Sequence, residues 1–287
     1  MGYYAELKHF VRMDVIRPVR RLRTLAAWKR WSFKGVPVIF GNSMPKSGSH
    51  LLMQVMQGIC KLGPFVETGT RPIRTITIDG RYRPTQEILR DLKKLRPGDV
   101  AAGYLRATSE NMQFIDRPGW VNYFIVRDPR DMLVSHIYYA TDIYLGHGMH
   151  DYYKSLPMDE RIKVAIRGVQ QPELSLPSVR TRYERITGWF DCPGVMTVHF
   201  EDLILQRENM LNKMLDHLER SGYRLQVDRA EAIETIMTTI DPQRSSTFRR
   251  GHVGDWREHF TEEHKQIFKE VAGDLVVCLG YEKNNDW

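Results

Sequence analysis

The chain has 287 residues, of which 42% are hydrophobic, so it is long enough for one large α/β domain with a core, although length alone also allows two domains. No apolar run approaches the roughly 18 residues of a membrane span, and no signal-peptide pattern opens the sequence. Cys60, Cys192 and Cys278 lack C-x-x-C or zinc spacing, which predicts buried free thiols in a reducing compartment. We therefore expect a soluble, cytoplasmic protein.

The net charge of +7 is concentrated at the start of the chain, where residues 1–34 hold nine basic residues against Glu6 and Asp14. Apolar residues recur there at intervals of three and four, and Pro18 interrupts the pattern. This is typical of a basic amphipathic helix, which can lie on an anionic membrane surface, dock on a protein partner or pack on its own domain with a solvated basic face. Nucleic acid is not an expected partner, because no known reading motif accompanies the basic residues. We expect residues 1–34 to form an arm and residues 35–287 to form the main domain.

Residues 36–52, VPVIFGNSMPKSGSHLL, combine a buried strand, a turn rich in Gly, Ser, Pro and Lys, and the start of an amphipathic helix. Backbone amides at the new helix N-terminus and the charge of Lys46 predict a site for a phosphate-like anion. The ATP-binding pattern G-x-x-x-x-G-K-[ST] fits imperfectly, because Met44 and Pro45 stand where its second glycine belongs. A solvated turn and a nucleotide kinase or NTPase remain alternatives.

Strands and helices alternate along the rest of the chain, as in a parallel sheet flanked by helices. Further strands are expected at residues 99–105, 121–126 and 194–203, with short extended pieces at 64–70 and 74–78. Helices are expected at residues 85–95, 109–114, 158–169, 177–190, 206–221 and 229–239. Asp128 and Pro129 suit the N-cap and first position of one more helix, which would follow Arg127 at the carboxyl end of its strand.

Three ordered segments resemble the sulfotransferases that use 3'-phosphoadenosine 5'-phosphosulfate (PAPS). The segment MPKSGSHLL is similar to the family's phosphosulfate loop. YFIVRDPRDMLVS at residues 123–135 and FRRGHVGDWREHFT at residues 248–261 are similar to its two 3'-phosphate segments. The resemblance implies a single α/β domain with a central parallel sheet and a P-loop-like phosphosulfate-binding loop. It implies transfer of a sulfonate group from PAPS to a hydroxyl or amine, leaving 3'-phosphoadenosine 5'-phosphate (PAP), with no metal. A catalytically inactive PAPS-binding relative is a further alternative.

The resemblance also implies the cofactor-binding residues. They are Lys46, Ser47, Gly48, Ser49, His50, Leu51, Arg127, Ser135, Phe200, Arg249, Arg250 and Gly251. Phe200 stands where the family has a tyrosine beside the adenine, so stacking is retained and a hydroxyl hydrogen bond is lost. The acidic pair that follows it, Glu201 and Asp202, also suits a metal site of an ATPase, which keeps that alternative open.

This assignment leaves the general base unidentified, because the sequence has Tyr104 at the position where the family's strand carries a histidine. Lys46 would stabilise charge that builds on the transferred group and the bridging oxygen, while Tyr104 or His50 would act on the acceptor. Four residues are further candidates, although each is more ordinary as a packing, capping or surface residue: Glu67, His136, His147 and His150. His147 and His150 also form an H-x-x-H pair, which is weak evidence for a metal.

The acceptor itself is not specified by the sequence. Tyrosines crowd residues 138–153, beyond the 3'-phosphate segment, and would suit an apolar or ring-bearing acceptor, although they serve equally well as core residues. Specificity lies in loops that vary freely on one fold. A small molecule, a lipid and a glycan therefore all remain acceptor classes.

Overall fold

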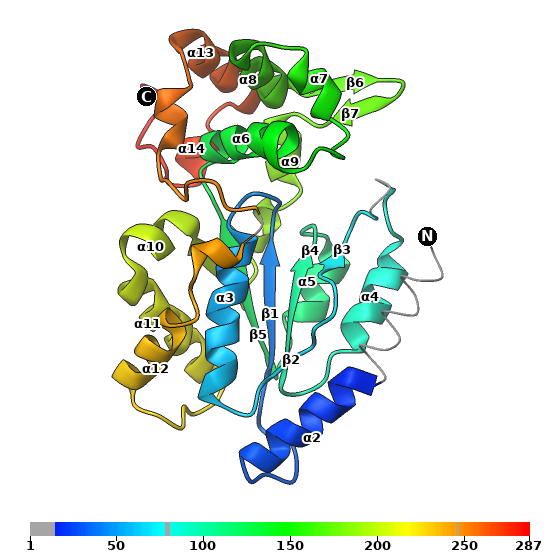
Figure 1. The fold of residues 1–287 in the computed structure, drawn as a ribbon, viewed down its shortest axis with the longest axis vertical. Coiled ribbons are helices and arrows are strands. Elements are labelled where there is room, and N and C mark those ends of the chain that lie inside the picture. The colour runs from blue at the N-terminus through cyan, green and yellow to red at the C-terminus, as the bar shows by residue number, and fades with distance from the viewer. Residues whose placement is uncertain (1–14, 78–80, 246) are drawn as a thin grey trace. The chain divides into compact units, whose positions relative to one another are not determined.

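The computed structural model describes residues 15–77, 81–245 and 247–287, and its central feature is a six-stranded parallel sheet (Figure 1). The strand order is β2-β4-β1-β5-β8, with β3 also pairing with β4. The strands are β1 Val38–Ser43, β2 Val66–Glu67, β3 Ile73–Arg74, β4 Asp99–Tyr104, β5 Trp120–Val126 and β8 Val195–His199. A separate antiparallel hairpin joins β6 Val169–Gln171 to β7 Leu174–Leu176. The predicted α/β fold with a central parallel sheet is confirmed.

Helices follow the strands in the order that the sequence predicts. The α-helices are α2 Arg17–Ala27, α3 Ser49–Ile59, α4 Thr85–Lys93, α5 Ser109–Ile115, α6 Pro129–Tyr138, α7 His150–Lys154, α8 Met158–Arg167, α9 Val179–Glu184, α10 Phe200–Leu205, α11 Arg207–Arg220, α12 Arg229–Met237, α13 Glu262–Ala272 and α14 Leu275–Cys278. Of these, α7, α10, α13 and α14 are additional to the predicted helices. A π-helical turn at Tyr139–Ile143 continues α6. Asp128 caps α6 by accepting a hydrogen bond from the Arg130 amide, and Pro129 opens the helix, as predicted.

The residues group into two compact units within this fold. Unit 1 comprises the chain up to Val126 together with Gly188–Pro242, and unit 2 comprises Arg127–Thr187 and Gln243–Trp287. The whole sheet lies in unit 1, so the strands around residues 36 and 121 share one unit as the sequence requires. The division into a 1–34 arm and a 35–287 domain stays a prediction.

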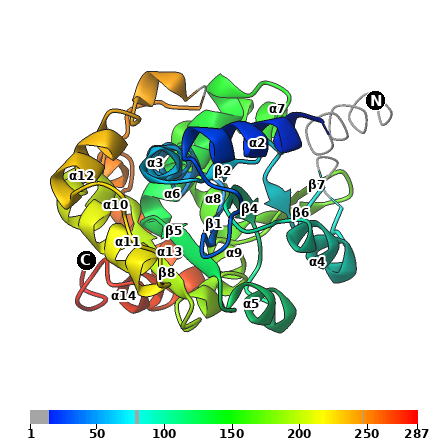
Figure 2. The ribbon, with the colours of Figure 1, turned by 90° about the horizontal axis from the view of Figure 1, so that it is seen from below.

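The core of unit 1 forms around β1 and β5, whose side chains are almost all buried. α3 packs against β1 on one side and α12 on the other (Figure 2). A Cβ atom at Gly58 would lie 2.7 Å from the Cα atom of Ile236, so α3 and α12 need a glycine at their closest approach. The Gln54 side chain then joins the two elements through the backbone of Asp241, at 2.7 and 3.1 Å.

Unit 2 is organised around α6, whose charged residues are buried as well as its apolar ones. The Arg130 guanidinium is 1% exposed, pairs with Asp128 and Glu282 at 2.7 Å each, and lies 3.9 Å from the centre of the Trp256 ring. These two carboxylates raise the pKa of Arg130, against the effect of burial. Trp256 and Phe260 are buried and anchor the carboxyl-terminal segment in the core.

α2 packs on unit 1 chiefly through two arginines, with Leu25 and Trp28 half-buried on the same side of the helix. Arg17 and Arg21 both pair with Asp99, which is fully buried at the start of β4, and the Arg21 guanidinium also stacks on Phe33 at 3.9 Å. α2 therefore lies against β2 at the end of the sheet where the strands begin (Figures 1 and 2). The sequence allowed for a packed helix with a solvated basic face, but here part of the basic face is turned inward because a buried carboxylate needs a counter-charge.

Three further expectations change in the structure. The strand expected at residues 194–203 ends at His199, and Phe200 begins α10, where Glu201 and Asp202 favour the helix N-terminus. The helix expected at 177–190 ends after α9 and resumes only as a 3₁₀ turn at Thr187–Trp189.

Cys192 is buried, but Cys278 is exposed, so the expectation of burial is wrong there. No helix in the described part of the chain is long and apolar enough to cross a membrane.

We expect Arg17→Ala combined with Arg21→Ala to destabilise the protein by about 3–5 kcal/mol, because it leaves the buried Asp99 carboxylate without a counter-charge. Urea unfolding followed by circular dichroism measures the change. Arg23→Ala is the matched control, since Arg23 lies on the exposed side of α2 and should shift stability by less than about 0.5 kcal/mol. Equal effects of the two variants would show that the pairing with Asp99 does not hold α2 in place.

Candidate functional site

The loop between β1 and α3 is built by Ser47 and Gly48. The Ser47 side chain is buried and donates to the carbonyl oxygens of Met44 and Ile125, at 2.7 and 3.2 Å, while its amide donates to Met44. Gly48 is the N-cap of α3, with φ +100°. Ser47 thus closes the turn and ties it to β5, whereas the amides that follow begin the first turn of α3, where they lack intrahelical acceptors.

Lys46 and His50 flank this helix start. Lys46 adopts φ +70°, a left-handed conformation that is uncommon outside glycine and is often retained at functional sites. His50 is exposed, and partial desolvation together with the charge of Lys46 lowers its pKa below the ordinary 6.5. His50 is consequently neutral at pH 7 and can accept a proton.

Tyr104 lies beside the same helix start. Its hydroxyl donates to the Ser49 hydroxyl at 3.0 Å, and the Arg74 guanidinium lies 5.2 Å from the centre of its ring. Asn42 fixes the end of β4, since its side chain accepts from the Leu105 amide at 2.8 Å and donates to the Leu105 carbonyl at 3.1 Å. The sequence-predicted residues Ser49 and Tyr104 thus meet at the carboxyl edge of the sheet, where parallel α/β proteins bind ligands, and Lys46 belongs to the same loop.

Phe200 also reaches this loop, from the first residue of α10. Its ring is 6% exposed, and a Cβ atom at Gly48 would lie 2.6 Å from it and 3.0 Å from the Ile125 side chain. The Phe200 ring therefore packs closely against the backbone of the loop at Gly48. Its expected role in stacking on adenine stays a prediction.

The second group of predicted residues assembles in unit 2. Arg127 is buried, donates to the His252 carbonyl at 2.9 Å and lies 3.5 Å from the Asp131 carboxylate. Asp131 in turn accepts hydrogen bonds from the amides of Gly254 and Trp256, at 2.8 and 2.9 Å. Burial raises the pKa of Asp131, against the lowering effect of Arg127 and of the two amides. α6 thereby holds the loop that follows the arginine pair.

Arg249 and Arg250 lie in this loop and are engaged with acidic residues. Arg249 pairs with Asp255, and its guanidinium lies 4.1 Å from the centre of the Tyr138 ring on α6. Arg250 is half exposed and approaches Asp255 at 3.5 Å and Glu258 at 3.2 Å. Gly251 is left-handed, with φ +63°. Ser135 is partly exposed on α6, the helix that contacts Arg249 through Tyr138.

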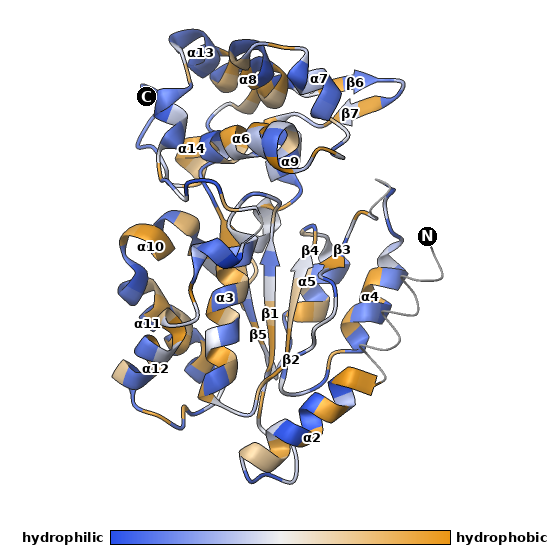
Figure 3. Ribbon diagram, in the orientation of Figure 1, coloured by the Kyte–Doolittle hydropathy of each residue, from blue (hydrophilic) through white to orange (hydrophobic). Residues whose placement is uncertain are grey.

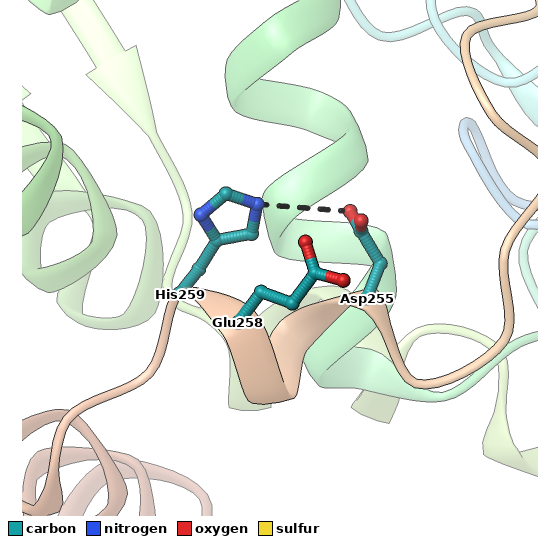
Figure 4. A group of neighbouring side chains, drawn as sticks. All are labelled: Asp255, Glu258 and His259. Carbon is teal, nitrogen blue, oxygen red and sulfur yellow. Dashed lines mark ion pairs between the residues drawn. The ribbon is translucent and has the colours of Figure 1, made fainter.

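Asp255, Glu258 and His259 form the one group of potential metal ligands among the described residues, with ligand atoms within 4.8 Å of one another. Figure 4 shows His259 pointing toward Asp255 at 3.9 Å. Both carboxylates are approached by arginines, and burial lowers the pKa of His259. We interpret the group as an ion-pair network, because guanidinium charges already neutralise the carboxylates.

The remaining candidates for a general base lie elsewhere. Glu67 pairs in register with Val100 near the start of β4, so it lies at the opposite end of the sheet from Tyr104, roughly 13 Å along the strand. His136 is buried in unit 2 in ring contact with His147, while His150 contacts the Ala140 carbonyl at 2.8 Å. The structure thus removes Glu67 from the phosphate loop and shows packing contacts for the three histidines.

Two residues of these clusters were not singled out from the sequence. Asn42 is a buried polar residue at the end of an apolar strand, a pattern that signals a side chain bonded to backbone. Asp131 lies inside the matched segment of residues 123–135, but only the fold shows that it holds amides 123 and 125 residues away. Spacing along the chain contains no signal for that contact.

A parallel sheet flanked by helices, with a lysine-bearing loop at the carboxyl edge between β1 and α3, is an architecture typical of enzymes that bind phosphate groups. The family model described as "Sulfotransferase domain" matches residues 123–280, which is more than half of the chain. The chain belongs to the sulfotransferase family, and it is a PAPS-dependent sulfotransferase. The prediction from the three sequence segments is confirmed, and the kinase alternative is set aside.

Known proteins support the same conclusion at low sequence identity. Sulfotransferase 1E1 of Rattus norvegicus is 22% identical over 246 residues, which is 79% of each chain. The crystal structure of mouse sulfotransferase SULT7A1 complexed with PAP is similar, with a TM-score of 0.57 and 19% identity over 92% of this chain and 93% of that one. Retinol dehydratase complexed with androsterone and PAP has a TM-score of 0.55 and 15% identity, over 83% of this chain and 80% of that one. These structures share the fold.

Gly48→Ala should destabilise the protein by about 2–4 kcal/mol and abolish nucleotide binding, because it adds a clash with Phe200 to the cost of a left-handed alanine. Gly119→Ala is the control, since Gly119 has φ +81° but no atom within 4 Å of an added Cβ; it should cost about 1–2 kcal/mol. Urea unfolding and calorimetry with PAP measure both. Unchanged PAP affinity in Gly48→Ala would contradict the assignment of this loop.

Proposed function

We propose that the loop at residues 44–51 binds the 5'-phosphosulfate of PAPS and that the loop of Arg249 to Gly251, with Arg127 and Ser135, binds its 3'-phosphate. Support for the first assignment comes from Lys46 and from the amides at the start of α3, which together offer a charge and several donors to one anion. Support for the second comes from the convergence of α6 and three arginines within unit 2. The residues of the first assignment lie in unit 1, and those of the second lie in unit 2.

In this scheme the acceptor oxygen attacks the sulfur atom, and the bond between sulfur and the bridging phosphate oxygen breaks. The acceptor proton passes to a base, and PAP leaves. Negative charge builds on the bridging oxygen, so a fixed cation next to it accelerates the reaction. Lys46 has this role in the proposal, and its strained backbone holds it at the turn.

The observation that carries the catalytic part of the proposal is the 3.0 Å hydrogen bond between the Tyr104 and Ser49 hydroxyls. It places Tyr104 at the helix start that would hold the sulfonate, which is where an acceptor hydroxyl has to arrive. The Arg74 guanidinium near the Tyr104 ring helps to hold the ring in this position. We therefore propose that Tyr104 orients and deprotonates the acceptor, with neutral His50 as the second candidate for the base.

For the acceptor we propose a small molecule that presents a hydroxyl. Retinol dehydratase, which is similar in fold, is described in complex with androsterone and in complex with retinol. Both compounds combine one hydroxyl with an apolar skeleton. The tyrosines of residues 138–153 are consistent with such a compound, although Tyr153 is fully buried and Tyr144 is exposed.

Tyr104→Phe should lower turnover at least tenfold while leaving PAP affinity unchanged, because it removes a proton acceptor and no nucleotide contact. Lys46→Ala should lower both, with a loss of turnover on the order of 100-fold or more. Steady-state sulfation of a phenol and an alcohol panel, with calorimetry for PAP, provides the two readouts. If Tyr104→Phe keeps the wild-type rate and His50→Gln is inactive, then His50 and not Tyr104 is the general base.

Tyr104→His tests whether the wild type is active at all. An imidazole with an ordinary pKa near 6.5 is a better base at neutral pH than a phenol, so activity gained in this variant means that Tyr104 only shapes the pocket. Activity in Tyr104→His with none in the wild type would identify a PAPS-binding relative that has lost catalysis. We expect measurable activity in the wild type.

Arg249→Ala should weaken PAP binding by about 10- to 100-fold and leave binding of adenosine 5'-monophosphate unchanged, because only PAP carries the 3'-phosphate. The second nucleotide controls for general damage from the loss of the Asp255 partner. Isothermal calorimetry measures both affinities. Equal losses for the two nucleotides would contradict the assignment of Arg249, and tighter binding of magnesium ATP than of PAP by the wild type would contradict the nucleotide.

A further inference from the structure

We propose that the outer face of α2 and the turn after it form a site that docks the protein on an anionic lipid surface. The site, called here the α2 face, consists of Val15, Val19, Leu22, Ala26 and Trp31 with the cations Arg23, Lys29 and Lys34. None of these residues belongs to the loops assigned above to PAPS. Substitutions in the α2 face can therefore change docking without changing the residues proposed for sulfonate transfer.

The first step of the argument is the orientation of α2. Arg17 is 5% exposed, and its guanidinium reaches both Asp99 and, at 2.8 Å, the Lys94 carbonyl. Arg21 reaches Asp99 at 2.7 Å and the Pro97 carbonyl at 3.0 Å. These contacts fix which side of the helix meets unit 1, so the opposite side is fixed as well.

The opposite side is apolar and exposed. Residues 15, 19, 22 and 26 lie on one helical face, and Val15, Val19 and Leu22 are 50%, 43% and 68% exposed. Trp31, just after the helix, is 101% exposed. Figure 3 shows strongly apolar and strongly hydrophilic stretches side by side along α2. Leu25 and Trp28 are half-buried on the side that carries Arg17 and Arg21, so α2 leaves one of its two apolar groups exposed.

Charge identifies the occupant of this face. Residues 15–34 contain seven basic residues and no acidic one. In the described part of the chain, Arg23, Lys29 and Lys34 form no side-chain ion pair. An apolar stripe flanked by cations, with a tryptophan at its end, has the composition of a helix that lies in the interface of an anionic membrane.

A second copy of this chain fits the face poorly. A two-fold contact would bring the same patch of both copies together, so Arg23, Lys29 and Lys34 would face like charges with no acidic residue of the segment to compensate them. Anionic phospholipid headgroups supply the missing negative charge, and acyl chains accept Val19, Leu22 and Trp31. Each basic residue near such a surface contributes about 1 kcal/mol.

The position of α2 in unit 1 separates docking from nucleotide binding. α2 contacts Asp99 at the first residue of β4, whereas Tyr104 ends the same strand, about 17 Å further along. Lipid bound to α2 therefore does not touch the phosphate loop. The site concentrates the protein on a membrane without altering its affinity for PAP.

The test uses the full chain and sedimentation with phosphatidylcholine vesicles that either contain or lack phosphatidylserine. We expect binding only to the anionic vesicles, and weaker binding as salt concentration rises. Leu22→Ser should weaken it about tenfold, and Arg23→Gln about fivefold. Each substitution has a matched control in unit 1: Leu205→Ser, because Leu205 is also 68% exposed, and Arg224→Gln, because Arg224 is also exposed.

Point substitutions are preferable to deletion of residues 1–34, because deletion would also uncover Asp99. The affinity for PAP should stay unchanged in all four variants, which shows that they fold and keeps this test independent of the proposed catalytic roles. Equal binding to both kinds of vesicle, or equal effects of Leu22→Ser and Leu205→Ser, would overturn the proposal. So would self-association in light scattering that Leu22→Ser abolishes, since the face would then bind a second copy.

Discussion

The site in unit 1 depends on a sharp left-handed turn at Gly48, between the end of β1 and the start of α3. At this turn the backbone changes direction so that α3 presents its first amides beyond the carboxyl edge of the sheet. A side chain at position 48 would strike Phe200 and Ile125, so the packing of β5 and α10 beneath the loop also depends on the glycine. Ser47 uses its hydroxyl to close the turn, which leaves Lys46 and Ser49 on the side that faces the ligand in our proposal.

In unit 2 several arginines lie close together, and acidic residues compensate their charge. Asp131 fixes the backbone of the loop through two amides, and Asp255 pairs with Arg249. A bound 3'-phosphate would add a second partner for guanidinium groups that are already oriented. Preorganisation of this kind lowers the entropy lost on binding.

Apolar runs and turn residues were sufficient to predict β1, β4, β5 and the helices that follow them, because each of these strands is buried and bounded by clear breakers. The strand predicted at residues 194–203 was too long, since the apolar run of β8 passes through Phe200 into α10 without a break. Asn42, Asp131 and the Tyr104–Ser49 contact depend on register between strands or on contacts across more than fifty residues. Local pattern contains no information about such partners, so these residues emerge only from the fold.

α2 shows the same limit most clearly, because periodicity identifies the two faces of a helix but not which one is buried. Val15, Val19 and Leu22 could equally have faced inward, but the side that does so carries Arg17 and Arg21, which pair with the buried Asp99 carboxylate. Leaving a buried charge unpaired costs several kcal/mol, and the stability lost by exposing a few aliphatic side chains is recovered when another apolar surface covers them. An interior ion pair can therefore turn an amphipathic helix outward and make its apolar face available for docking.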